Sequence, residues 1–200
     1  MSVFIQLFFI GLMTLISVTV HAREMQLDAS VLLTAMDAGG NDDFKSGKGL
    51  ALQYSYYLKQ WLAADVGLFV SDQTFTNSSR DVVGDYRASI QSKSILLGIK
   101  PRHRFAAPYE VYARLGIQYW QTELEVEEYF NESVPGGKTS ATDTGTGYYA
   151  SLGGAHYISE RVIVQLELRH MMQLDVFEGE SDNPFDLRIN ALSFGFGYRF

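Results

Sequence analysis

Beyond residue 22, apolar and polar side chains alternate with a period of two residues over most of the sequence. Leu27, Val31 and Leu33 alternate with Asp28 and Ser30, and similar patterns recur in seven further segments. Such alternation is typical of β-strands with two unlike faces. The eight predicted strands cover residues 27–35, 49–56, 62–71, about 87–99, 109–120, about 144–158, 162–169 and 192–200.

The more polar of the two faces decides between a soluble and a membrane barrel. Many charged side chains, amides and glycines lie on it, and a soluble eight-stranded barrel could not pack them into its core without a large desolvation cost. Inside a membrane barrel they can pair with one another and hold water, while the apolar face meets lipid. A closed barrel also leaves no backbone group unpaired in lipid. We therefore predict an all-β, eight-stranded antiparallel transmembrane β-barrel with up-and-down meander topology.

Chain length is consistent with this strand number. Membrane strands need about 9–11 residues each, so eight of them use about half of the residues after residue 22. Ten strands remain an alternative. In the fourth segment the alternation loses its phase near residues 92–94. A β-bulge, or a part of the strand that extends beyond the membrane, would explain this loss.

The predicted connections also alternate, between short and long. Three are short or compact and basic: residues 59–60, 100–108 and 159–161. Four are longer and mostly acidic or polar: residues 37–48, 72–85, about 123–143 and about 178–186. Short turns face the periplasm in such barrels, so both termini are expected there. Aromatic residues near the two predicted rims are typical of interfacial girdles: Tyr56, Tyr57, Trp61, Tyr109, Tyr157, Tyr198 and Phe200 at one end, and Phe75, Trp120 and Phe177 toward the other.

The N-terminal segment predicts export. Residues 3–20 carry no charge and are mostly apolar, and they end in Val20-His21-Ala22, with charge beginning at Arg23. This arrangement is typical of a signal peptide with a cleavage site. An uncleaved membrane helix is the alternative, because the run approaches a bilayer span. We predict a signal peptide over residues 1–22 and a barrel domain over residues 23–200, located in the bacterial outer membrane.

Composition excludes several classes of protein. The absence of cysteine rules out a disulfide scaffold, a thiolate metal site, a catalytic thiol and a lipid-anchored mature N-terminus. A net charge of -7 argues against nucleic acid as a partner. Outer-membrane lipids, including lipopolysaccharide, are the expected surroundings of what we predict to be a monomer.

The end of the chain resembles the C-terminal signal of bacterial outer-membrane barrels. It reads Phe194-Gly195-Phe196-Gly197-Tyr198-Arg199-Phe200, and the resemblance implies that Phe196, Tyr198 and Phe200 are read by the barrel assembly machinery. Internal segments resemble the transmembrane domain of the outer membrane protein A family: residues 112–116 with Trp120, residues 152–154 followed by Tyr157-Ile158, and residues 166–168.

This family resemblance implies an eight-stranded barrel with a role in envelope integrity and surface contacts, and sometimes a narrow gated pore. Asp65 and Glu167 fall where the family has inward carboxylates, and Arg114 where it has an inward arginine. Three positions depart from the pattern: Leu96 replaces a lumen lysine, Gln165 an arginine and His156 a carboxylate. The family's gating pairs therefore cannot be carried over intact. Its periplasmic peptidoglycan-binding domain is not part of this sequence.

The candidate site is a set of charged residues on the polar face: Asp65, Arg114, Glu167 and Arg169. An eight-stranded barrel is just wide enough for its own side chains, and an unpaired buried charge would be costly. We therefore predict that these residues neutralise one another as a polar network that fills the lumen. A narrow ion-conducting pore is the alternative.

An enzyme that modifies lipid A is a third hypothesis, which we disfavour. Ser159 and His170 are the nearest candidates for a nucleophile and its base, but the predicted topology puts them at opposite ends of a strand. His103 lies in a predicted basic turn and His21 in the predicted signal peptide. Two acidic segments, residues 41–43 and 178–182, lack the spacing of a calcium loop. No catalytic residue, metal site or cofactor is predicted.

Overall fold

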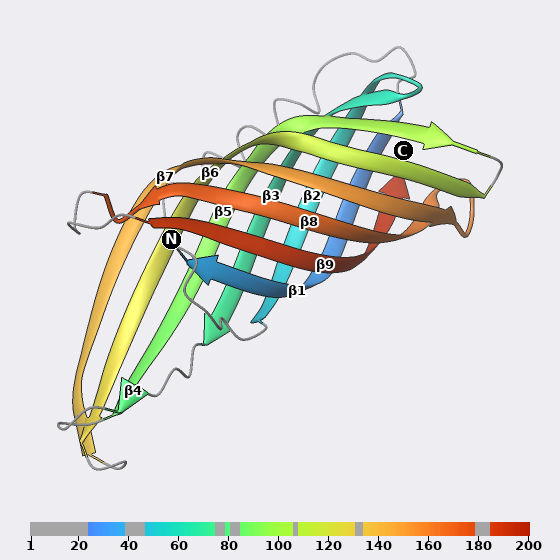
Figure 1. The fold of residues 1–200 in the computed structure, drawn as a ribbon. Helices are drawn as coiled ribbons and strands as arrows, with labels where there is room; N and C mark the ends of the chain where they lie inside the picture. The colour runs from blue at the N-terminus through green and yellow to red at the C-terminus, as the bar shows by residue number, and fades with distance from the viewer. Residues whose placement is uncertain are drawn as a thin grey trace.

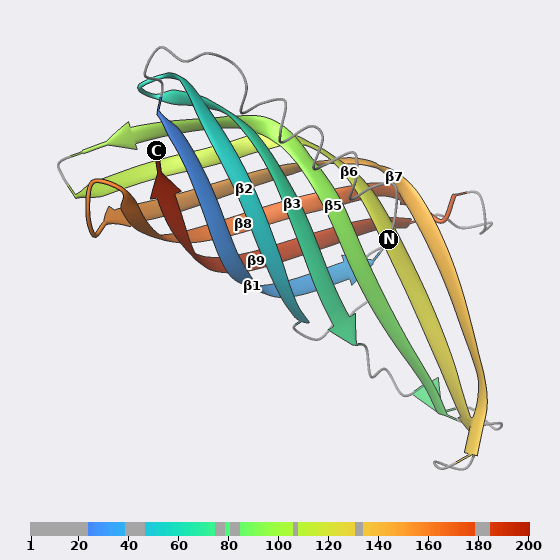
Figure 2. The same ribbon diagram turned by 180° about the vertical axis from the view of Figure 1, so that it is seen from behind.

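The structure is a computed structural model that describes residues 24–38, 47–74, 79–80, 85–105, 108–130, 134–178 and 185–200. Within them, eight long antiparallel strands pair in chain order, and the last pairs with the first, so that the sheet closes into a ring (Figures 1 and 2). This confirms the predicted barrel. The strands are β1 (Met25–Ala38), β2 (Gly47–Lys59), β3 (Leu62–Thr74), β5 (Asp85–Arg104), β6 (Tyr109–Phe130), β7 (Val134–Tyr157), β8 (Val162–Val176) and β9 (Phe185–Arg199), with a two-residue β4 (Ser79–Arg80) beside β5.

Side chains alternate around the ring as the period of two predicts. On β1, Val31 is 58% exposed on the outer surface, whereas its neighbour Leu32 is 2% exposed inside. Charged residues such as Arg114 and Asp65 lie on the buried inner face, and large apolar residues cover the outer one. The outer surface therefore has the composition that lipid requires.

β5 corrects two expectations. Its pairing with β3 and β6 runs without a register shift past residues 92–94, so no bulge lies there. Ser92, Ser94 and Leu96 all point inward in one continuous phase, and the outward Lys93 is the polar residue that obscured the pattern. β5 also continues to Arg104, so residues 100–104 belong to the strand and the connection to β6 is shorter than predicted.

The predicted loop at residues 123–143 is wrong. β6 and β7 continue as paired strands as far as Phe130 and Val134, and in Figure 1 they sweep together far beyond the ring, with β5 alongside. We call residues 123–143 the arm. Its strands are polar on most positions, because they are not buried in a core, and this polarity suggested a loop.

Both ends of the described chain lie at the same rim of the barrel. Gln26, near the start of β1, is opposite Arg199 at the end of β9. The tight turns at residues 60–61 and 158–161 are at this rim, which is the periplasmic end by the short-turn rule. The predicted signal peptide and most of the predicted loop at residues 37–48 lie outside the described residues.

Candidate functional site

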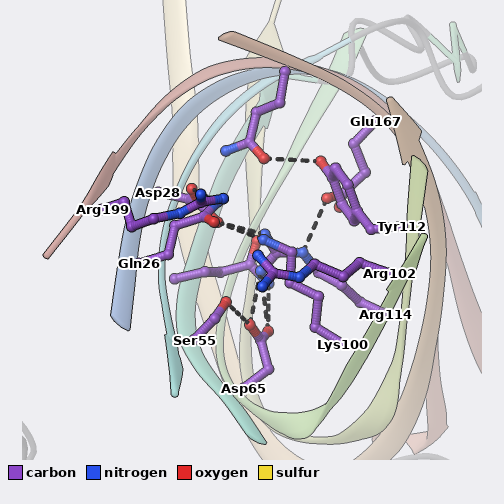
Figure 3. Close-up of polar contacts among 12 residues, drawn as sticks. Gln26, Asp28, Ser55, Asp65, Lys100, Arg102, Tyr112, Arg114, Glu167 and Arg199 are labelled. Carbon is purple, nitrogen blue, oxygen red and sulfur yellow. Dashed lines mark hydrogen bonds and ion pairs between the residues drawn. The ribbon is translucent and has the colours of Figure 1, made fainter. Parts of the chain in front are cut away.

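Arg114 is the centre of a charge network inside the barrel. Its side chain is fully buried, and its guanidinium reaches three carboxylates from three other strands (Figure 3). Nη2 lies 2.7 Å from Oδ2 of Asp28, Nη1 lies 3.0 Å from Oδ1 of Asp65, and Nε lies 3.1 Å from Oε2 of Glu167. One side chain on β6 thus braces β1, β3 and β8 across the lumen.

Two further cations balance these carboxylates. Nη2 of Arg169 donates to Oε1 of Glu167 at 2.6 Å, and Nζ of Lys100 lies 3.2 Å from Oδ2 of Asp28. Three carboxylates therefore face three buried cations, and the network is neutral as a whole. Neutral pairing is what allows charges to remain buried without a prohibitive desolvation cost.

Neutral polar side chains donate further hydrogen bonds to Asp28 and Asp65. Oγ of Ser55 donates to Oδ1 of Asp65 at 2.6 Å, and Nε2 of Gln26 donates to Oδ1 of Asp28 at 2.7 Å. Gln53 adds a contact on each side, because its Nε2 donates to Asp65 and its Oε1 accepts from Arg169. These bonds fix the carboxylates in place and link the charged residues into one continuous cluster.

A second cluster lies at the periplasmic rim, around Glu24. Its carboxylate accepts two hydrogen bonds from Arg102, at 2.5 and 2.8 Å, and pairs with Arg104 at 3.1 Å and Arg199 at 2.6 Å. Burial alone would raise the pKa of Glu24, but the hydrogen bond from Arg102 and the charges of the three arginines outweigh it and hold the pKa below its ordinary value. The guanidinium of Arg102 also stacks on Tyr57, 3.5 Å from the ring centroid.

The half of the lumen nearer the arm is largely apolar, a feature that the alternation in the sequence did not predict. A continuous cluster of buried side chains fills it, including Leu32, Phe69, Leu96, Trp120, Met171, Leu187 and Ile189. Leu96, at the position where the family resemblance implied a lysine, is a member of this cluster. The lumen therefore has an ionic layer and a mainly apolar layer, and the apolar layer contains a buried polar group, Ser92, Thr122 and Gln173, whose side chains bond to one another.

All four predicted network residues lie together in this ionic layer: Asp65, Arg114, Glu167 and Arg169. Asp28 was assigned to the polar face but not to the network. Its place on the same inward side of β1 as the other polar residues was the feature that could have identified it. Lys100 was placed in a turn, and this is wrong: it is buried beside Asp28. Counting in twos from Ser94 would have put Lys100 inside.

Other inward and outward assignments need correction. Trp120, Phe177 and Tyr57 are not girdle residues, since they are only 1%, 5% and 3% exposed. Each lies on the inner side, where an aromatic ring fills the lumen instead of meeting the interface. His156, placed at an inward carboxylate position by the family resemblance, faces outward. Phe75 lies outside the described residues.

The residues considered for catalysis do not meet. Nδ1 of His170 lies 2.8 Å from Oδ1 of Asn190 on the outer surface. Ser159 is in the periplasmic turn, where its Oγ accepts hydrogen bonds from the backbone of Arg161 and Val162. The strand from Val162 to His170 alone spans about 26 Å, which is far beyond hydrogen-bond reach.

Two features that would indicate another function are absent from the described residues. These residues contain no group of three or more His, Asp or Glu side chains placed to hold a metal ion. They also contain no helix long and apolar enough to cross a membrane. The predicted acidic segments at residues 41–43 and 178–182 lie mostly outside the described part of the chain.

Comparison with known proteins establishes the class. Residues 8–200 match the family described as the outer membrane protein beta-barrel domain, and the chain belongs to this family. No curated protein sequence matches it. The prediction of a small outer-membrane barrel is therefore confirmed, and the family relationship indicates an outer-membrane location.

Solved structures share the fold at low sequence identity. Ail, the attachment invasion locus protein of Yersinia pestis, is 13% identical with a TM-score of 0.58, and the match covers 90% of this chain and 100% of Ail. A major outer membrane protein from Thermus thermophilus is 12% identical with a TM-score of 0.58, over 90% and 100% of the two chains. OprG from Pseudomonas aeruginosa is 11% identical with a TM-score of 0.55, over 90% and 96%.

Proposed function

We propose that this protein is a non-enzymatic outer-membrane barrel, closed to ions, with a structural and surface-contact role. The observation that carries the proposal is the position of Arg114, which forms ion pairs with carboxylates of three other strands inside the barrel. A barrel of eight strands encloses little more than its own side chains. A side chain that spans this space obstructs the passage of a hydrated ion.

The apolar layer supports the same proposal by a separate mechanism. An ion that passed the charge network would next have to cross a region lined by Phe69, Leu96 and Met171, all at most 1% exposed. These apolar side chains offer an ion no ligands to replace its water, and hydrophobic constrictions close channels by excluding water. The polar side chains of Ser92, Thr122 and Gln173 in the same half are bonded to one another. Opening the lumen would require both layers to rearrange.

Single-channel recording in planar bilayers tests this proposal. The wild-type protein is expected to show no steady conductance. A steady conductance that changes in Asp65→Ala or Arg114→Ala, but not in the lipid-facing control Leu152→Ala, would establish the alternative of a narrow pore. Leu152 is 66% exposed on the outer surface, so its truncation leaves the lumen intact.

The arm supports the surface-contact part of the proposal. Residues 123–143 contain six acidic residues and one lysine. Glu123, Glu125 and Glu127 lie on one face, and Lys138 pairs with Glu125 at 2.7 Å. Ail has been solved with the heparin analogue sucrose octasulfate, a polyanion. The acidic arm of this chain favours a cationic partner instead, because like charges repel.

Shortening the arm tests this part without disturbing the lumen. Leu124 and Ala141 are directly opposite each other, so residues 125–140 can be replaced by Asn-Gly, a two-residue hairpin connection. Vesicles that carry the wild-type protein should adhere to polylysine-coated beads in a salt-sensitive manner, and the shortened variant should adhere less. Equal adhesion of the two, or stronger adhesion to heparin-coated beads, would remove the proposal.

A further inference from the structure

A hollow on the outer surface of the barrel contains polar side chains where lipid contact is expected. It crosses four neighbouring strands, and four outward residues lie side by side at one level: Ala150 on β7, His170 on β8, Asn190 on β9 and Ala35 on β1. The two alanines form the floor of a shallow depression that is open to the surroundings and has a volume of about 720 Å³; its sides are Leu33, Leu152, Leu168 and Leu192.

His170 and Asn190 bond to each other and to no other described residue. Nδ1 of His170 lies 2.8 Å from Oδ1 of Asn190, and both side chains are exposed. Nε2 of the histidine and Nδ2 of the asparagine have no partner among the described residues. Acyl chains offer no hydrogen-bonding group, and unpaired polar groups in hydrocarbon are costly. A polar ligand group in the hollow would remove this cost.

The height of the hollow indicates which part of a lipid reaches it. Tyr198 marks the periplasmic interface on β9, and the outward residues above it are Phe196, Phe194 and Leu192, then Asn190 and Arg188. Ten residues of strand tilted by about 40° rise about 25 Å, which equals the height of the apolar band of such barrels. Arg188 therefore lies at the outer interface, and Asn190 lies about 5 Å below it by the same rise per residue.

Arg188 supplies positive charge just above the hollow, outside the set of residues that line it. It follows Asn190 on the outer face of β9 and is exposed, and it lies opposite Asp37 of β1 in the register. A guanidinium has five N–H donors, so one carboxylate does not exhaust it. Arginine is also the side chain whose geometry best fits phosphate.

We propose that this hollow binds a phosphorylated glycolipid of the outer leaflet. Arg188 holds a phosphate, His170 and Asn190 bond to sugar hydroxyl groups, and acyl chains lie along the leucines below. The site is on the outer surface, so the proposal is independent of whether the lumen conducts. It depends only on the outer-membrane location that the family relationship indicates.

Native mass spectrometry of the purified full-length barrel, titrated with defined lipids, tests this site. Lipid A is expected to bind at least about tenfold more tightly than dephosphorylated lipid A or phosphatidylglycerol, since one charge-assisted contact contributes about that factor. Arg188→Gln should remove the preference for phosphate. The double variant His170→Leu/Asn190→Leu should weaken binding of both forms of lipid A.

The control is Lys93→Gln, which removes an outward cation on β5, away from the four strands of the hollow. Its lipid binding should stay within about twofold of wild type, because only charges at the site contribute contacts. Each variant must first show heat-modifiable migration in SDS gels, which establishes that its barrel is folded. The proposal is overturned if phosphatidylglycerol binds as tightly as lipid A, or if Lys93→Gln loses as much affinity as Arg188→Gln.

Discussion

Arg114 on β6 and Asp28 on β1 meet at 2.7 Å inside the barrel, although 86 residues separate them in the sequence. The same guanidinium reaches Asp65 and Glu167. A contact of this kind forms only when the ring has closed, because β1 and β6 are not neighbours in the sheet. The network therefore stabilises the closed barrel as a whole more than any single pair of strands.

Removal of Arg114 should destabilise the barrel strongly. Arg114→Ala leaves three buried carboxylates with only two buried cations. Breaking a buried ion pair in this way costs about 3–5 kcal/mol of stability. Equilibrium unfolding by urea in lipid vesicles measures the free energy. Arg114→Lys keeps the charge but not the forked donors, so its free energy of unfolding should lie between those of the wild type and Arg114→Ala. An Arg114→Ala barrel as stable as wild type would show that water or lumen rearrangement compensates the charges.

A close approach of two glycines should also be sensitive to substitution. Gly98 and Gly116 are paired across β5 and β6 beneath Tyr149, and a Cβ on Gly116 would lie 2.2 Å from the carbonyl oxygen of Leu97. Gly116→Ala should therefore lower the free energy of unfolding by about 1–3 kcal/mol through overpacking.

Gly154 provides the matched control for this substitution. It faces outward on β7, and an added Cβ would meet nothing within 4 Å. Gly154→Ala should leave the urea midpoint within experimental error of wild type. Equal effects of the Gly116 and Gly154 substitutions would mean that the loss comes from strand propensity and not from crowding.

The rim cluster predicts a specific dependence of stability on pH. The pKa of Glu24 is lowered in the folded protein from its ordinary value of 4.5, since the arginines outweigh the effect of burial. Its contribution is therefore present above about pH 4.5 and is lost as the pH falls through the lower folded value. Glu24→Gln should reduce stability near neutral pH, and its difference from wild type should shrink in acid.

Urea unfolding at a series of pH values measures this difference directly. Glu160→Gln, in the exposed turn at the same rim, is the control for a loss of negative charge without the arginine contacts. A Glu24→Gln difference that stays constant or grows as the pH falls would contradict the assigned sign.

Substitution of the C-terminal residue should affect assembly of the barrel more than its stability. Phe200 is 63% exposed, its ring packs edge-on against Tyr198 at 5.0 Å, and its amide donates to the carbonyl of Met25. Phe200→Ala keeps the backbone bond, so the purified barrel should lose less than about 1 kcal/mol. If Phe200 is part of a recognition signal, assembly into membranes by the cellular machinery should slow severalfold. Pulse–chase measurement of heat-modifiable protein in cells distinguishes the two effects.

Much of the barrel could be predicted from the sequence, since alternation is a local property of each strand. Alternation along each strand is enough to identify the apolar residues that face outward. It also identifies the inward charges Asp65, Arg114, Glu167 and Arg169. Prediction failed where polarity suggested a loop or turn. The arm is polar because it has no core to face, and the strand that contains Lys100 is basic because it carries its cations toward carboxylates on other strands.

The sequence by itself predicted eight strands, and it placed Asp65, Arg114, Glu167 and Arg169 on the inner side of the sheet, because the alternation that reveals them is read along each single strand. It did not determine which charges meet, or that apolar residues such as Phe69 and Leu96 fill the half of the lumen nearer the arm. Those features depend on the register between strands and on the distance across the closed ring. Only the tertiary structure decided them, since contacts such as that of Arg114 with Asp28 join strands that are far apart in the sequence.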